Sequence, residues 1–247
     1  VDPVYLQLEN ERVFGRTWQL VGRMDQVRET GQFFTTEIAG EQLVIVRDGE
    51  DDAGRARLRG YHNVCLHRAG PVAYGCGKRQ TLQCRYHGWT YNLKGELLRA
   101  PEMEGVERFV PGEMRLVPVQ VDHWGPLVFA NLDPKAAPLA HFLGDIPQRA
   151  ERFHAERMTW VLRKDYEIAC NWKVYVDNYL EGYHLPVVHP GLHKELDYDA
   201  YRVEPHRYWS LQHAPLRAAH GDAHDRKYVA GEGQASDAQY YWLFPNV

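Results

Sequence analysis

The sequence has few cysteines, no long apolar run and no excess of basic charge. Four cysteines in 247 residues are too few for a disulfide-stabilised scaffold of this length. No apolar run approaches the roughly 20 residues that span a bilayer, and the first residues lack the features of a signal peptide. A formal net charge of −4 and a pI near 6.4 argue against nucleic acid or an anionic membrane as the main partner. We therefore expect a cytoplasmic protein with reduced thiols.

Histidine and short β-prone runs are what the sequence does contain. There are 13 histidines, and histidine is the commonest transition-metal ligand near neutral pH. Short runs rich in β-branched and aromatic residues are separated by glycine-containing turns, including Asp48-Gly49 and Lys94-Gly95. This spacing predicts an antiparallel sandwich or barrel. The runs are 33–38, 42–47, 57–62, 91–98, 116–121 and 127–132.

Composition divides the chain into four segments. Pro3 is typical of a helix start, and the stretch before the second half is rich in proline and alanine, as linkers are. The segments are 1–32 with a helix and an extended stretch, 33–133 with the β-rich domain, 134–150 as the linker, and 151–247 as a second domain.

The second domain begins with helical sequence. Asn171 is the expected N-cap of a helix over 172–183, which Pro186 should end. Aromatic residues at 240–244 predict a buried strand near the end of the sequence. Ending a domain on a core strand leaves that strand uncovered, so we expect further sequence beyond residue 247.

Two Cys/His pairs form the first candidate metal site. Cys65 and His67 have one residue between them, and Cys84 and His87 have two. Thiolates and imidazoles bind both zinc and iron–sulfur clusters. Paired zinc ligands are usually two to four residues apart, so the closer Cys65/His67 pair favours a cluster, in which one iron takes both thiolates and the other both imidazoles. Two β-hairpin tips that meet would supply such a ligand set.

These residues carry a resemblance to a known family. The sequences 63–68 (Asn-Val-Cys-Leu-His-Arg) and 84–89 (Cys-Arg-Tyr-His-Gly-Trp) resemble the two loops of a Rieske [2Fe–2S] domain, over roughly residues 33–132. A structural zinc site is the alternative. No cysteine follows Cys84 in the second loop, so the sequence is similar to the oxygenase or ferredoxin branch of the family. Cys76 and Cys170 are then expected to be ordinary buried thiols.

A second candidate metal site lies in the second domain. On a helix, Asn178, Glu181 and His184 would share one face because they are three residues apart. A turn after Pro186 could bring His189 back toward His184. Two histidines and a carboxylate are the ligand set of a non-haem Fe(II) facial triad.

This segment resembles the mononuclear iron motif of Rieske oxygenase α subunits. The resemblance implies that His184 and His189 bind iron, and that Glu181 links an iron-ligand histidine to a cluster-ligand histidine of a neighbouring subunit. Asp177 and Asn178 are candidates for orienting the iron ligands through hydrogen bonds. The family's third ligand is a later Asp, and we expect it beyond residue 247. The acids in the sequence that we leave unassigned are Asp197, Asp199, Asp222, Asp225 and Asp237.

The same resemblance implies the fold class and the activity. The fold is then α+β, with an all-β Rieske domain followed by a helix-grip (START/Bet v1-like) catalytic domain. The protein would be a terminal oxygenase that uses O₂ and electrons from an NAD(P)H-dependent flavin reductase, with or without a ferredoxin. We expect a homotrimer, because the two metal centres of one chain would be too far apart for electron transfer.

Three points about function stay open in the sequence. Glu rather than Asp at position 181 resembles the branch of the family that oxidises quaternary ammonium compounds such as carnitine and betaines, which slightly favours such a substrate over aromatic-ring hydroxylation. A Rieske ferredoxin-type electron carrier and a zinc-stabilised binding module are competing hypotheses. Four aromatic residues could build a cage for a methylammonium group, although core packing is the better interpretation of them. These residues are Trp160, Tyr208, Trp209 and Tyr240.

Overall fold

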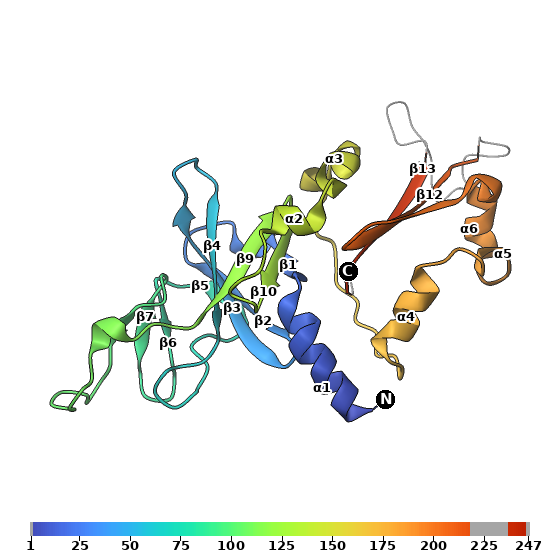
Figure 1. The fold of residues 1–247 in the computed structure, drawn as a ribbon. Coiled ribbons are helices and arrows are strands. Elements are labelled where there is room, and N and C mark those ends of the chain that lie inside the picture. The colour runs from blue at the N-terminus through green and yellow to red at the C-terminus, as the bar shows by residue number, and fades with distance from the viewer. Residues whose placement is uncertain (1, 218–236, 246–247) are drawn as a thin grey trace. The chain divides into compact units, whose positions relative to one another are not determined.

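The computed structural model describes residues 2–217 and 237–245 and has a mixed α+β fold (Figure 1). Within it, Pro3–Leu139 forms one compact unit and Ala140–Val247 belongs to a second. None of the described helices is long and apolar enough to cross a bilayer.

The first unit is built almost entirely from short strands. Its longest helix, α1, begins at Pro3 as expected, since the fixed φ of proline suits the first turn. Its elements are α1 (Pro3–Arg12), η1 (Phe14–Arg16), β1 (Gln19–Arg23), η2 (Met24–Val27), β2 (Gln32–Ile38), β3 (Glu41–Glu50), β4 (Ala56–His62), β5 (Cys76–Lys78), β6 (Thr81–Gln83), β7 (Thr90–Asn92), β8 (Leu97–Arg99), η3 (Pro111–Glu113), β9 (Pro118–Trp124) and β10 (Leu127–Asn131).

Two antiparallel sheets make up the first unit. The larger has the order β1-β10-β9-β4-β3-β2-β5, and the smaller has the order β6-β7-β8. Strand β3 is buried on both faces: Leu43 and Ile45 belong to one apolar cluster, while Val44 and Val46 belong to the other. The second cluster also contains Leu82 and other residues of the small sheet. The two sheets therefore share a core, as expected for a β sandwich or barrel.

One predicted turn is in a different place. Asp48 and Gly49 do not form the β3–β4 turn; strand β3 continues to Glu50 with an irregular register after Arg47. The turn follows at Asp51, whose carboxylate accepts hydrogen bonds from the backbone N–H groups of Ala53 and Arg55. A local Asp-capped turn thus replaced the Asp-Gly turn that the sequence suggested.

The second unit combines short helices with a small sheet. Its elements are α2 (Leu139–Leu143), α3 (Ile146–Ala150), η4 (Glu151–Phe153), η5 (Ala155–Arg157), α4 (Trp172–Tyr179), α5 (Leu185–Val188), α6 (Pro190–Glu195), η6 (Tyr198–Ala200), β11 (Arg202–Pro205), β12 (Trp209–Pro215) and β13 (Asp237–Leu243). The first of these, α2, begins on the last residue of the first unit. The proline- and alanine-rich stretch 134–150 is thus not an extended linker throughout, since it contains α2 and α3, with Leu139 and Ile146 buried.

Strand β12 organises the second unit. It lies between β11 and β13 in an antiparallel sheet. Its Ala214 shares a buried cluster with Leu185 of α5 and with Leu196, so the helices after α4 pack against it. The predicted strand over 240–244 is present as part of β13, although most of its side chains are only half-buried.

The predicted helix over 172–183 is shorter than expected. Asn171 is its N-cap, accepting a hydrogen bond of 3.0 Å from the backbone N–H of Lys173, as predicted. However, α4 ends at Tyr179. Pro186 does not end this helix; it lies in the first turn of α5, where its missing N–H costs nothing. Glu181 and His184 are therefore in a turn between two helices.

Candidate functional site: two metal-ligand clusters

The two Cys/His loops of the first unit have the same backbone hydrogen-bond pattern. In the first, the Cys65 carbonyl accepts from the N–H four residues later and the Cys65 N–H donates to the carbonyl of Gly70. In the second, Cys84 makes the equivalent bonds to Gly88 and Trp89. The residue four positions after each cysteine has positive φ, +56° at Ala69 and +74° at Gly88. The matching backbone places the paired ligands in equivalent positions in the two loops.

Only one of these loops is a hairpin tip, contrary to the expectation. Cys84 to Gly88 lies between the paired strands β6 and β7. The first loop joins β4 to β5, which are not neighbours in the sheet. Asn63 holds it instead: this buried side chain accepts from the N–H groups of Val72 and Ala73 and donates to the Ala73 carbonyl. The Asn63 side chain therefore holds the first loop in place, as strand pairing holds the second loop.

The two cysteines of the loops are buried and close to each other. Cys65 and Cys84 are both free thiols and 2% and 3% exposed. Burial raises the pKa of the Cys65 thiol, and the charge of Cys84 acts in the same direction. A side chain at Gly70 would place its Cβ 3.1 Å from Cys84 Sγ, so glycine leaves room at that sulfur. Two buried thiols with no disulfide between them suit a metal or cluster that takes thiolates.

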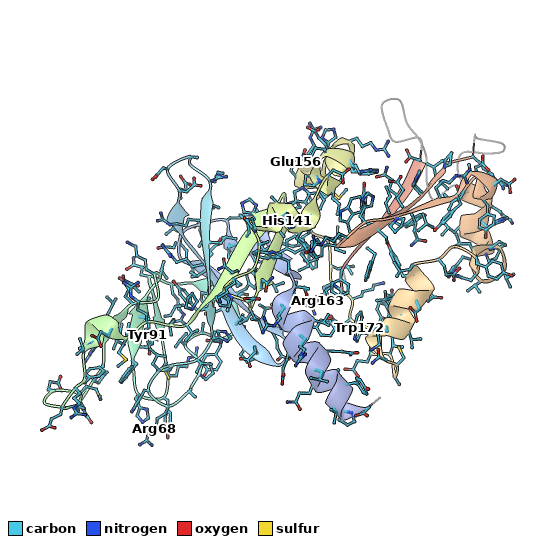
Figure 2. The ribbon with its side chains drawn as sticks, in the orientation of Figure 1. Arg68, Tyr91, His141, Glu156, Arg163 and Trp172 are labelled. Carbon is cyan, nitrogen blue, oxygen red and sulfur yellow. The ribbon has the colours of Figure 1, made fainter. Side chains whose placement is uncertain are left out.

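Tyr91 lies on β7 (Figure 2) and contacts Cys65. Its Oη lies 3.4 Å from Cys65 Sγ and accepts a hydrogen bond of 3.2 Å from the N–H of Leu66. Either atom of the Oη–Sγ pair can be the donor; a metal-bound thiolate has no proton, so against a bound metal the Tyr91 hydroxyl would donate to the sulfur. Burial raises the pKa of Tyr91, so the hydroxyl keeps its proton near neutral pH.

The rings of the two loop histidines lie next to each other in an edge-on arrangement. Their ring centroids, in His67 and His87, are 4.5 Å apart, and the His67 ring stacks on Trp89 with 7° between the planes. His67 Nδ1 is buried and has no hydrogen-bond partner among the described residues. Burial lowers the pKa of His67, and the charge of His87 lowers it further. A neutral imidazole with a buried, unpartnered nitrogen is suited to metal ligation.

The ligand arrangement suits a two-iron cluster. In a Rieske cluster each iron takes only two protein ligands, a pair of thiolates or a pair of imidazoles. The buried thiol pair and the two neighbouring loop histidines therefore meet the requirement of that cluster.

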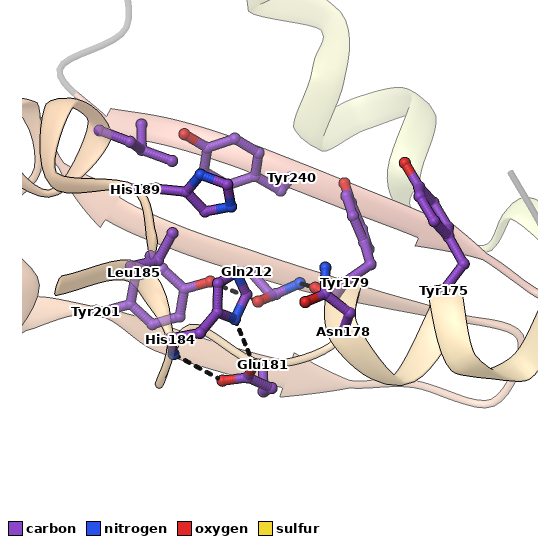
Figure 3. A pocket seen from close by; sticks show the side chains of 11 residues that line it. Tyr175, Asn178, Tyr179, Glu181, His184, Leu185, His189, Tyr201, Gln212 and Tyr240 are labelled. Atoms are coloured by element: carbon purple, nitrogen blue, oxygen red, sulfur yellow. Dashed lines mark hydrogen bonds and ion pairs between the residues drawn. The ribbon is translucent and has the colours of Figure 1, made fainter. Parts of the chain in front are cut away.

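The turn between α4 and α5 holds the second ligand set (Figure 3). Glu181 hydrogen-bonds through Oε1 to Nδ1 of His184, and through Oε2 to the N–H groups of Tyr183 and His184. These bonds lower the pKa of Glu181, the His184 contact most of all. His189, which ends α5, places its ring centroid 5.2 Å from that of His184. The predicted Glu181–His184–His189 group is thus brought together by a turn, although not by a helix face.

A cavity of about 240 Å³ lies beside these residues. Asn178 lines it, whereas Asp177 on α4 is exposed and does not. Figure 3 shows Tyr175 and Tyr179 projecting from α4 along the same side. The residues that line the cavity are Tyr175, Asn178, Tyr179, Glu181, His184, Leu185, His189, Leu192, Tyr201, Gln212 and Tyr240.

None of the described unassigned acids completes a three-ligand set. Asp197 and Asp199 do not line the cavity, and Asp237 makes an ion pair of 2.9 Å with Arg152. Asp222 and Asp225 lie outside the described residues.

Several cavity residues were not singled out from the sequence. The cavity is also lined by Tyr175, Tyr179, Tyr201 and Gln212. Tyr201 and Gln212 come from later segments whose sequence has no local sign of a binding site. Of the candidate aromatic cage, only Tyr240 lines the cavity.

The remaining three members of that cage lie elsewhere. Trp209 is buried and stacks on His206 with ring centroids 3.7 Å apart, and Tyr208 packs on Phe142. Trp160 is 48% exposed. Core packing, the better interpretation from the sequence, holds for Trp209.

The two remaining cysteines differ from the expectation. Cys76 and Cys170 are free but exposed, not buried. Cys76 is on the edge strand β5, where all three residues are exposed, and Cys170 lies just before the N-cap of α4.

Comparison with known proteins matches both halves of the chain to described families. Residues 17–110 match the family described as Rieske [2Fe-2S] domain, and residues 155–247 match the family described as ring hydroxylating alpha subunit (catalytic domain). The chloroplastic choline monooxygenase of Arabidopsis thaliana is 34% identical over 258 residues, covering 99% of this chain and 58% of that protein. The carnitine monooxygenase oxygenase subunit of Escherichia coli (strain K12) is 32% identical over 246 residues, covering 96% and 62%.

A solved structure supports the same relationship. It is described as a quaternary ammonium Rieske monooxygenase whose structure reveals insights into carnitine oxidation and inter-subunit electron transfer. The TM-score is 0.80 at 28% sequence identity, covering 96% of this chain and 62% of that one. The chain therefore spans less than two thirds of the length of these relatives.

Proposed function

We propose that this chain, which belongs to the Rieske-type non-haem iron oxygenases, acts as a terminal oxygenase component. Proteins of this family join a [2Fe–2S] domain to a catalytic domain that uses a mononuclear iron. This chain would use O₂ and reducing equivalents to hydroxylate or demethylate a small organic substrate. The observation that carries this proposal is the presence, in one chain, of a buried thiol pair, of two neighbouring loop histidines and of a separate two-histidine turn.

We assign the ligands from the contacts. Cys65 and Cys84 would hold one iron of the cluster, and His67 and His87 the other. The buried Nδ1 of His67, which has no partner among the described residues, supports that nitrogen as its ligand atom. The cluster supplies one-electron transfer, and a ferrous centre with open positions supplies O₂ activation.

His184 and His189 would hold the mononuclear iron. Since His184 Nδ1 is bonded to Glu181, Nε2 is the nitrogen left for a metal. Asn178 lies near enough to the cavity to orient a ligand or substrate, whereas exposed Asp177 has no described contact that supports the same role. The third ligand would be an acid that follows the two histidines in the sequence.

We propose a quaternary ammonium compound as the substrate, with a carnitine- or betaine-like molecule favoured. Both curated relatives and the solved structure are named for choline, carnitine or quaternary ammonium chemistry. The cavity supports this, because Tyr175, Tyr179, Tyr201 and Tyr240 line it and aromatic faces attract cationic methylammonium groups. Aromatic-ring hydroxylation is the second candidate, since the same ring faces can also stack on an arene.

The electron supply and assembly are proposed on the same basis. An NAD(P)H-dependent flavin reductase, with or without a ferredoxin, would deliver electrons to the cluster. A homotrimer would bring one subunit's cluster to the next subunit's iron through Glu181. The Glu181 side chain is 44% exposed although it is already bonded to His184, so it is accessible to a second histidine. The solved relative is itself described in terms of inter-subunit electron transfer.

We also propose a cytoplasmic location and the domain limits given above. The four free thiols support a reducing compartment, although the plant relatives are chloroplastic. The two family matches, over 17–110 and 155–247, support the division into a Rieske domain and a catalytic domain that begins near residue 151.

Metal analysis and O₂ uptake test the proposed function. The anaerobically purified protein should contain acid-labile sulfide and show the EPR signal of a reduced Rieske cluster. Oxygen consumption with a reductase should depend on the substrate, and betaines, carnitine and choline should stimulate it more than simple arenes. A colourless protein that holds zinc and no sulfide would disprove the oxygenase proposal.

A further inference from the structure

The turn that carries Glu181 and His184 has little regular structure of its own. It begins after Tyr179, the last residue of α4, and ends at Leu185, the first residue of α5. The last carbonyl groups of a helix have no partner within the helix. Contacts from outside the turn must therefore hold the side chains of Glu181 and His184 in place.

Gln212 of β12 supplies one such contact. Its Nε2 donates a hydrogen bond to the backbone carbonyl of Tyr179, and its Oε1 accepts one from the hydroxyl of Tyr201. The side chain is 2% exposed, and a buried amide is costly unless its polar atoms are paired. Both of these partners lie around the turn, so the amide connects the centre of the sheet to the end of α4.

Tyr201 holds the same turn from a second direction. Its ring packs on Gly182, where an added Cβ would lie 2.7 Å from the ring carbon Cζ. Burial raises the pKa of Tyr201 to about 12, so its hydroxyl stays protonated and remains a donor to Gln212. The glycine between Glu181 and Tyr183 is thus needed for a close approach, and Gln212 fixes the tyrosine that makes it.

We propose that Gln212, acting through Tyr201 and the Tyr179 carbonyl, is a positioning residue for the Glu181–His184 pair and so for iron retention by His184 and His189. This inference rests on the proposed mononuclear iron site. Gln212 is assigned no contact with the metal; it fixes the turn whose N–H groups, at Tyr183 and His184, hold the Glu181 carboxylate.

Two substitutions remove the hydrogen bonds while keeping the volume. Gln212→Met removes both bonds, and Tyr201→Phe removes one while leaving the ring on Gly182. Ser210→Ala is the matched control, because Ser210 is buried two residues away on the same strand and its Oγ has no partner among the described residues. Thermal unfolding shows whether each variant is folded. If Gln212→Met does not fold, Tyr201→Phe tests the proposal in its place.

Iron retention is the first measurement. After dialysis against a moderate chelator, the iron-to-sulfide ratio should be about 1.5 when the mononuclear site is filled and about 1.0 when only the cluster remains. Wild type and Ser210→Ala should stay near the higher value. Gln212→Met and Tyr201→Phe should bind the third iron about tenfold more weakly, the lower end of the effect of losing a partner bonded directly to a metal ligand, because these two residues act on His184 through the turn.

Hydrogen exchange in the metal-free protein is the second measurement. The amides of Tyr183 and His184 should exchange faster in Gln212→Met and Tyr201→Phe than in Ser210→Ala. Unchanged iron retention and unchanged exchange in folded variants would overturn the role of Gln212. A wild-type protein whose ratio is already near 1.0 would instead overturn the proposed iron site, and the inference with it, so the two failures are distinguishable.

Discussion

Replacing Tyr91 by Phe should lower the reduction potential of the cluster. The Tyr91 hydroxyl lies 3.4 Å from Cys65 Sγ. A thiolate bound to the cluster has no proton, so the hydroxyl would be the donor in this contact. Reduction adds negative charge to the cluster and its thiolates. A donor at a thiolate therefore stabilises the reduced form more than the oxidised form.

The size of the effect follows from the strength of one hydrogen bond. A typical intramolecular hydrogen bond contributes about 1 kcal/mol net. For a one-electron couple about 59 mV corresponds to a tenfold change, or about 1.4 kcal/mol. Loss of the Tyr91 hydrogen bond should thus lower the potential by about 40 mV. The ring remains in place in the variant, so the apolar cluster around Cys65 and Cys84 keeps its packing.

A potentiometric titration followed by visible absorption or EPR measures this change. Tyr61→Phe is the control, since Tyr61 is equally part of that core but donates its hydrogen bond to the Leu93 carbonyl, 3.0 Å away. The control should lose stability without a change in potential. A Tyr91→Phe potential equal to that of wild type, or higher, would refute the reasoning.

Three further predictions concern stability, pH and electron transfer. Asn63→Leu removes three buried hydrogen bonds of the first ligand loop; it should lower the free energy of unfolding by about 2–5 kcal/mol and reduce the sulfide content per chain. Burial alone would raise the pKa of Glu204, but its ion pairs with Arg149 and His213 outweigh burial and lower it. These pairs therefore contribute stability above the ordinary pKa of Glu, and that stability is lost as the pH falls through the pKa of Glu204 in the folded protein. For this reason Glu204→Gln should show a smaller drop in melting temperature than wild type between about pH 5 and pH 3. Glu181→Ala should abolish substrate-coupled O₂ uptake but leave the Rieske EPR signal unchanged; intact coupled uptake would contradict the bridging role.

Candidate ligands could be predicted from the sequence where a residue type has a specific chemical use. Cys65, His67, Cys84 and His87 could be paired because few sites besides metal centres need thiolates and imidazoles at such spacings. The strands of the first unit could be placed because the β-prone runs between turns are short and regular. The Asp48-Gly49 turn was wrong because two acceptable turn sequences lie close together, and only tertiary contacts choose between them.

The α4–α5 turn shows where a local pattern can mislead. Glu181 and His184 do meet, as their spacing suggested, but α4 has ended before either residue. Two local signals favoured a turn: Gly182 disfavours a continuing helix, and Pro186 is as typical of a helix start as of a helix end. Weighing these against the three-residue spacing would have predicted the short second helix.

The contacts that hold this turn could not be read from the sequence, for a different reason. Gln212 bonds to Tyr179 across a separation of 33 residues, and Tyr201 meets Gln212 across 11. Each is an ordinary residue for its own strand or loop, and nothing in the neighbouring sequence marks it as a partner of the turn. Ligand atoms must be chemically unusual, whereas the groups that position them need only be polar, buried and in register. For this reason the proposed ligands could be picked out by residue type, while the residue that we propose to position them became visible only when β12 was placed beside α4.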